Sequence, residues 1–104
     1  MSTTHTPGPW REHSHRQIGP DAGIVCEVWS AIGETDADRI AQADANARLI
    51  AAAPDLLEAL QEMVAGDAEA IEDAKRLGVP FPDEMLAAYH KARAAIAKAT
   101  GEQP

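Results

Sequence analysis

The sequence predicts an α+β protein: an N-terminal β-hairpin followed by a mainly α-helical region that ends in an antiparallel helical hairpin. Three observations lead to this prediction. A short run rich in β-branched and aromatic residues, 24–29, follows a cluster of turn-forming residues. Apolar residues then recur at intervals of three and four over much of residues 36–100. Prolines and glycines divide that helical stretch at Pro54 and at residues 78–82.

The first 32 residues are expected to form an arm and the hairpin. Residues 1–9 are polar and contain Pro7 and Pro9, which fix φ and favour an extended arm. Trp10 follows at once, where its ring typically fills an apolar groove and holds the arm. Residues 10–32 are predicted to form the hairpin, which must lie on the helices or pair with a partner's sheet to be stable. Its second strand places alternate side chains on opposite faces, Ile24, Cys26 and Val28 on one and Val25, Glu27 and Trp29 on the other.

The first helix is predicted to begin near residue 36, with Asp36 or Asp38 as its N-cap. Its apolar side recurs with helical spacing, and Pro54 requires it to end at about residue 52 or 53. Proline is well tolerated in the first turn of a helix, so a second helix should start at Pro54. The first apolar stripe comprises Ile40, Ala43, Ala47 and Ile50, and the second comprises Leu56, Leu57, Leu60, Met63 and Val64.

The second helix should continue to residue 77, with Gly66 either interrupting it or weakening it. Gly78 is well suited to close it. The last helix is predicted over residues 82–100, with Pro82 in its first turn and Gly101 at its end. A short proline-rich link between two helices favours an antiparallel hairpin.

Length and composition indicate one domain with a thin core. The chain has 104 residues, only 4% of them aromatic, and much of its apolar content is alanine. Alanine buries little surface, and a short chain buries a smaller fraction of its surface than a long one. We therefore expect a homo-oligomer, in which association adds the missing burial.

The net charge of −8 argues against direct nucleic-acid binding, which needs lysine and arginine to displace phosphate counterions. An acidic surface that imitates DNA is the alternative to an ordinary solvated surface, and we favour the latter. The single cysteine, Cys26, excludes an intrachain disulfide. No apolar run is long enough for a membrane span and no signal-peptide core is present, so we expect a soluble intracellular protein.

No strong catalytic motif is present, and we expect neither an enzyme nor a metal or cofactor site. His5, His13, His15 and Cys26 include one His-x-His pair, but the other spacings of a zinc site are missing. A polar strand face explains these histidines. Cys26 lies in a β-branched run, where a free cysteine is usually a small buried hydrophobe rather than a nucleophile.

Asn46 and Arg48 stand out in an otherwise apolar helical segment. One interpretation is a structural clamp, in which Asn46 holds the arm or the hairpin and Arg48 pairs with an acid. The other is a pocket between subunits, in which arginines hold phosphate, a tryptophan stacks on a base and Asn46 binds a base edge. The candidate ligand-binding residues are Trp10, Arg11, Arg16, Trp29, Arg39, Asn46 and Arg48.

Two segments, HTPGPW at residues 5–10 and ANARLIAAAPDLLEAL at residues 45–60, together with the strand near residues 24–28, resemble a group of small bacteriophage and prophage proteins of unassigned function. The resemblance covers residues 5–64, and we identify none for residues 65–104. It implies a phage accessory protein that acts in the host cytoplasm, and it implies no reaction. Accessory phage proteins of this size often antagonise host defences, either by blocking a protein or by sequestering a nucleotide immune signal.

We therefore expect an inhibitor of host anti-phage immunity, acting as a homo-oligomer that sequesters a nucleotide-derived signal. The alternative is a protein-binding module whose acidic helical face blocks a host defence or nucleic-acid-processing protein. The expected partners are a second copy of the chain and either a nucleotide-like small molecule or a host protein. Nucleic acid and membrane are not expected partners.

Overall fold

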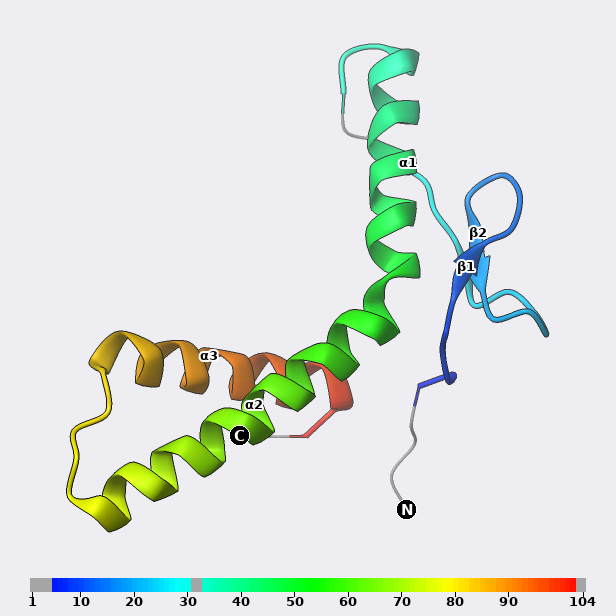
Figure 1. The fold of residues 1–104 in the computed structure, drawn as a ribbon. Helices are drawn as coiled ribbons and strands as arrows, with labels where there is room; N and C mark the ends of the chain where they lie inside the picture. Colours follow the sequence, from blue (N-terminus) through cyan, green and yellow to red (C-terminus); the bar gives the residue numbers. More distant parts are fainter. Residues whose placement is uncertain (1–4, 31–32, 103–104) are drawn as a thin grey trace. The chain divides into compact units, whose positions relative to one another are not determined.

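A computed structural model describes residues 5–30 and 33–102 (Figure 1). The parts of the predicted arm and hairpin at residues 1–4 and 31–32 lie outside these ranges. The chain divides into two compact units, Met1–Leu56 and Leu57–Pro104, here called the N-terminal and C-terminal units. Three strands precede three helices, which confirms the predicted α+β class. No helix in the described ranges is long and apolar enough to cross a membrane.

The sheet consists of β1 (Arg11–Glu12), β2 (Gln17–Gly19) and β3 (Cys26–Glu27), antiparallel in the order β1-β2-β3. Ile18 is central, since it pairs with Glu12 on one side and with Cys26 on the other. The sheet therefore has three strands, whereas the predicted hairpin had two. His15 and Arg16 take left-handed conformations, with φ of 50° and 61°, and these make the tight turn between β1 and β2. Such values are uncommon outside glycine, so the sequence pattern does not reveal this turn.

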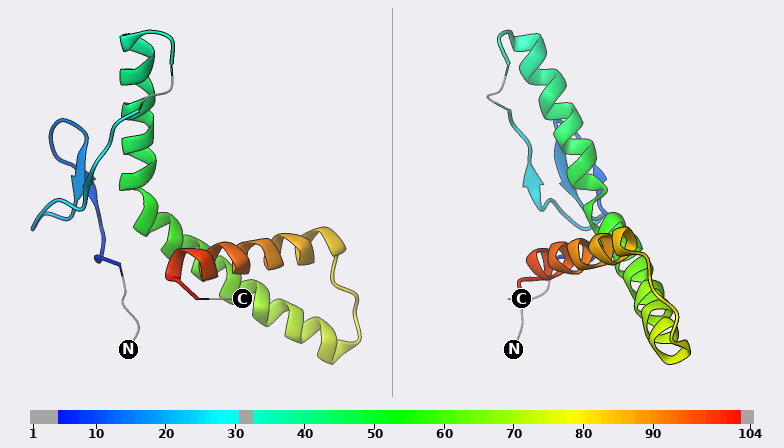
Figure 2. Two further views of the ribbon diagram at one scale, coloured as in Figure 1. Left: turned by 180° about the vertical axis from the view of Figure 1, so that it is seen from behind. Right: turned by 90° about the vertical axis from the view of Figure 1, so that its left-hand side faces the viewer.

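The core of the N-terminal unit lies between the sheet and α1 (Asp36–Ala51), which packs against β1 and β2 (Figure 2). Ile18, Val28 and Ala47 form its buried centre. Trp10 packs against this centre, and its indole N–H donates to the Thr6 carbonyl at 3.1 Å, so it holds the arm as predicted. Further side chains at its edge are Cys26, Ile50 and Ala51.

Helix α1 begins one residue after its N-cap, Thr35, whose hydroxyl accepts from the Asp38 N–H at 3.1 Å. The predicted caps, Asp36 and Asp38, were wrong, because both lie inside the first turn. There their charge stabilises the positive end of the helix dipole instead. The helix ends at Ala51 and α2 (Ala53–Leu77) follows, so the predicted boundary beside Pro54 is confirmed to within two residues.

The C-terminal unit contains most of α2 and all of α3 (Asp83–Thr100), which form the predicted helical hairpin. Gly66 does not interrupt α2. Gly78 ends it with φ of 69°, and the Val79 N–H bonds back to the Ala74 carbonyl at 2.9 Å. Pro82 is the N-cap of α3 rather than its first helical residue, and Gly101 closes α3 in the left-handed conformation. Among the described residues, neither helix buries a side chain completely.

Candidate functional site

A cavity of about 300 Å³ lies in the N-terminal unit, beside the first half of α1. It brings together three of the seven predicted ligand residues, Arg16, Trp29 and Arg39. They come from the β1–β2 turn, the segment after β3 and α1. Three segments far apart in sequence therefore meet here. The remaining lining residues are Ser30, Asp36, Ile40 and Ala43.

Arg16 contacts several of the segments that surround this cavity. Its backbone carbonyl accepts from the Val28 N–H at 3.0 Å, which ties the β1–β2 turn to the end of β3. Its guanidinium lies over the Trp29 ring, 5.7 Å from the centroid, and pairs with Asp44 at 3.4 Å. The Arg16 side chain is only 23% exposed, and its Nε is buried without a hydrogen-bond partner among the described residues. A buried donor of this kind destabilises the folded protein unless an acceptor forms a hydrogen bond with it.

Trp29 and Arg39 supply the open part of the site. Trp29 is 72% exposed, which leaves much of its indole available for stacking even with Arg16 against it. Arg39 donates to the Gly33 carbonyl at 3.0 Å and pairs with Asp36 at 2.6 Å. Two guanidinium groups beside an exposed indole can bind a flat ring that carries an anionic group.

Two carboxylates that hold these arginines, Asp36 and Asp44, were not among the predicted site residues. The spacing of Asp36 and Arg39, three residues on one helix, is a signal that could have suggested their pairing. Asp44 and Arg16 are 28 positions apart, and no local pattern connects them. Both ion pairs reduce the net charge of the cavity, so an anionic ligand would have to displace carboxylates.

The other predicted ligand residues lie away from this cavity. Trp10 belongs to the core, and Arg11 pairs with Asp21. Asn46 is half-buried on α1, and Arg48 is exposed on the same helix. Within the described ranges, Asn46 makes no side-chain hydrogen bond and Arg48 makes no ion pair, so neither contact of the proposed clamp is present.

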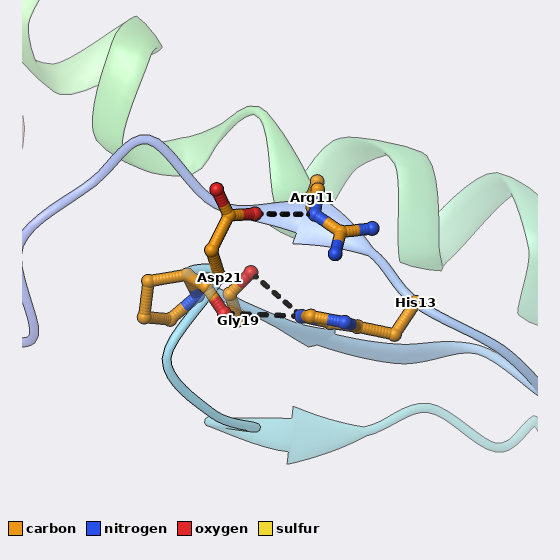
Figure 3. Close-up of polar contacts among 5 residues, drawn as sticks. Arg11, His13, Gly19 and Asp21 are labelled. Carbon is orange, nitrogen blue, oxygen red and sulfur yellow. Dashed lines mark hydrogen bonds and ion pairs between the residues drawn. The ribbon is translucent and has the colours of Figure 1, made fainter.

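A second polar cluster lies beside β1, β2 and the turn after β2, and it accounts for the positions of Arg11 and His13 (Figure 3). Arg11 Nε donates to the Asp21 carboxylate at 2.6 Å. His13 Nε2 lies 3.2 Å from the Gly19 carbonyl oxygen and 3.1 Å from that of Pro20, so this nitrogen carries the proton and donates. These contacts fasten the turn after β2. No group of three metal-ligating side chains occurs in the described part of the chain.

The hydrogen bond from Arg11, followed by its charge, holds the pKa of the Asp21 carboxyl below its usual range. Replacing Arg11 with glutamine should therefore raise the pKa of Asp21 toward the ordinary aspartate value, which an NMR pH titration of the side-chain carboxyl would measure. Arg16→Gln is the matched control, because Arg16 pairs with Asp44 rather than Asp21 and its loss should leave the titration of Asp21 unchanged. Equal titration of Asp21 with and without Arg11 would contradict this contact.

The sign of the effect on stability follows from the direction of this shift. A carboxyl with a lower pKa in the folded state stabilises that state above its unfolded pKa, and the contribution is lost as the pH falls through the folded value. The Arg11–Asp21 pair should therefore matter at neutral pH and disappear in acid. Because both side chains are well exposed, at 59% and 89%, the contribution is small.

Comparison with known proteins identifies a family but no activity. No curated protein and no solved structure matches the chain. A family model described as Salmonella phage P22 protein Y8K6 matches residues 1–103. This confirms the phage origin that the resemblance implied, and the match extends over residues 65–103, for which no resemblance was identified. The chain belongs to the Salmonella phage P22 protein Y8K6 family.

Proposed function

We propose that this phage protein is a non-enzymatic inhibitor of host anti-phage immunity that binds and sequesters a nucleotide-derived signal as a homo-oligomer. The observation that carries the proposal is the arrangement of Arg16, whose guanidinium lies between an exposed indole and a carboxylate beside a cavity of about 300 Å³. Membership of a phage family supports a role in the infected host.

The chemistry of the cavity fits one nucleotide unit. A base would stack on Trp29, as bases commonly stack on exposed aromatic side chains. A phosphate would bind Arg16 and Arg39, whose planar guanidinium groups match phosphate oxygens. Asp36, which now pairs with Arg39, is 91% exposed, and an ion pair this open contributes at most about 1 kcal/mol. A doubly charged phosphate can therefore displace it at little cost.

Isothermal titration calorimetry with a panel of cyclic nucleotides and cyclic ADP-ribose isomers tests the proposal. One of these ligands should bind, and Trp29→Ala or Arg16→Gln should weaken it by about tenfold or more, the effect of losing one base stack or one charged contact. Asp44→Asn should strengthen binding, because it frees Arg16 from its carboxylate.

Arg48→Gln is the matched control for these variants. It removes the same charge from an exposed position on α1 outside the cavity, so it should leave the affinity unchanged. No heat with any ligand of the panel would overturn the proposal, as would equal losses from Arg16→Gln and Arg48→Gln.

A second candidate is the protein-binding module that blocks a host defence or nucleic-acid-processing protein. The observation that favours it is the surface of the C-terminal unit, where acidic helices carry large exposed apolar side chains. A pull-down from host lysate should then return one stoichiometric protein, and Trp29→Ala should not affect its capture. The exposed apolar residues concerned are Met63, Leu77 and Met85 on the helices and Val79 in the link between them.

A further inference from the structure

We infer that a second copy of this chain packs antiparallel against α2, along an exposed apolar stripe formed by Met63, Ala70 and Leu77. This stripe is here called the α2 seam. The α2 seam would be the surface that holds the homo-oligomer together, and the existence of a homo-oligomer rests on the proposed function. The ligand cavity lies in the N-terminal unit and the seam residues lie in the C-terminal unit, so the two can be tested separately.

The α2 seam lies next to the side of α2 that meets α3, but not within it. Met63, Ala70 and Leu77 are seven residues apart, the spacing that keeps side chains on one side of a helix. Val64 and Ile71 each come one position later, about 100° round the helix, and they line the cavities of about 490 and 480 Å³ shared with α3. The side of α2 that meets α3 is therefore a different side. Met63 is 66% exposed and Leu77 is 71% exposed, so both side chains are available to a partner.

The helical hairpin also lacks the burial that would make it stable alone. Among the described residues of α2 and α3, no side chain is completely buried. A unit of this size buries too little surface by itself, and small helical units commonly gain stability by oligomerisation. Two hairpins that join through their α2 helices would bury the seam residues of both copies between these two helices. A second copy is available wherever the protein is made, and its seam is equally apolar.

Charge along the edge of the seam selects the antiparallel orientation. Glu62 and Arg76 each come directly before a seam residue, so they flank the seam on the same side. They lie eight residues before and six residues after Ala70. A two-fold axis near Ala70 therefore brings Glu62 close to Arg76 of the second copy, and the reverse pair forms by symmetry. A parallel pair would instead place Glu62 beside Asp67 of the second copy, where like charges repel.

Two neighbouring contacts modify this pairing. Arg76 already pairs with Asp73 of its own helix at 2.6 Å, but this pair is well exposed and leaves the guanidinium able to take a second carboxylate. Glu69 precedes Ala70 and would lie near its own counterpart across the axis, where like charges repel. Removing that charge should strengthen the dimer.

Native mass spectrometry and sedimentation of the full chain over a range of concentrations test the inference. We expect a dimer, which Met63→Glu or Leu77→Glu should convert to a monomer while circular dichroism shows unchanged helix content. Gln61→Glu adds the same charge to an exposed position of α2 outside the seam, so it should leave the dimer intact. A monomer at every concentration, or a dimer that survives both seam variants, would overturn the inference.

A charge exchange tests the orientation. Glu62→Arg and Arg76→Glu should each weaken dimerisation by about tenfold, the equivalent of 1.4 kcal/mol. The double variant should restore it, and Glu69→Gln should tighten it. A double variant that stays weak would exclude the antiparallel pairing. Calorimetry on monomeric Met63→Glu tests dimerisation and ligand binding separately. This variant should still bind the ligand, because only the seam is broken.

Discussion

Replacing Ile18 with alanine should destabilise the N-terminal unit by about 3 kcal/mol, within the range of 2 to 5 kcal/mol found for buried isoleucine. Ile18 is 0% exposed and is the largest side chain of the core that is completely buried. Its buried neighbours, Val28 and Ala47, are smaller and cannot fill the space it would leave. Domains of ordinary size are stable by about 5 to 15 kcal/mol, so this single change would remove much of the total.

Urea denaturation followed by tryptophan fluorescence measures this effect directly. Both tryptophans of the chain, Trp10 and Trp29, belong to the N-terminal unit, so their emission reports on that unit. Ile24→Ala removes the same atoms from a side chain that is 55% exposed, and it should cost much less, about 0.5 kcal/mol. Equal losses from the two variants would show that Ile18 is not the centre of the core.

The sequence predicted the parts of this fold that depend on local signals. Ala43 and Ala47 were expected on the inner side of α1 because they follow helical spacing, and they are buried. Gly78 and Gly101 were expected at helix ends and take the left-handed conformation that such ends require. The division of the first predicted strand into β1 and β2 was missed because it depends on a turn made by His15 and Arg16, which are not turn-forming residue types.

The candidate site shows the same division between local and tertiary information. Arg16, Trp29 and Arg39 could be selected by residue type, because phosphate and base recognition use arginine and tryptophan. Their meeting could not be predicted, since it requires the β1–β2 turn to lie against α1. Asn46 and Arg48 were selected for standing out in an apolar helix, but the helical period turns Arg48 outward to solvent and leaves Asn46 only half-buried.

Replacing Gly19 with alanine should be nearly as damaging as the loss of Ile18. A Cβ at this position would overlap the Gly23 carbonyl oxygen and would lie 2.9 Å from both the Ile24 Cα and the Val25 nitrogen. All three are backbone atoms, so no side chain can move aside. The Val25 N–H also donates to the Ile18 carbonyl at 2.7 Å, and moving the chain would break this bond. We expect a loss of about 3 kcal/mol, the upper part of the usual range for overpacking.

Gly23→Ala is the matched control, because a Cβ at Gly23 meets nothing within 4 Å. This substitution should be neutral or slightly stabilising, since alanine restricts the unfolded chain. If the two glycine variants unfolded at the same urea concentration, the close approach of residues 19 and 23–25 would be excluded.

The Gly19→Ala and Gly23→Ala variants also test whether the sheet positions the candidate site. Gly19 does not line the cavity, but β2 continues directly from Arg16, whose carbonyl is bonded to Val28. A shift of β2 should therefore separate Arg16 from Trp29 and weaken any ligand that needs both. Calorimetry at a temperature where both variants are folded should show lower affinity for Gly19→Ala than for Gly23→Ala. Equal affinities would mean that the position of Arg16 is set by its contacts with α1 and Trp29 rather than by the sheet.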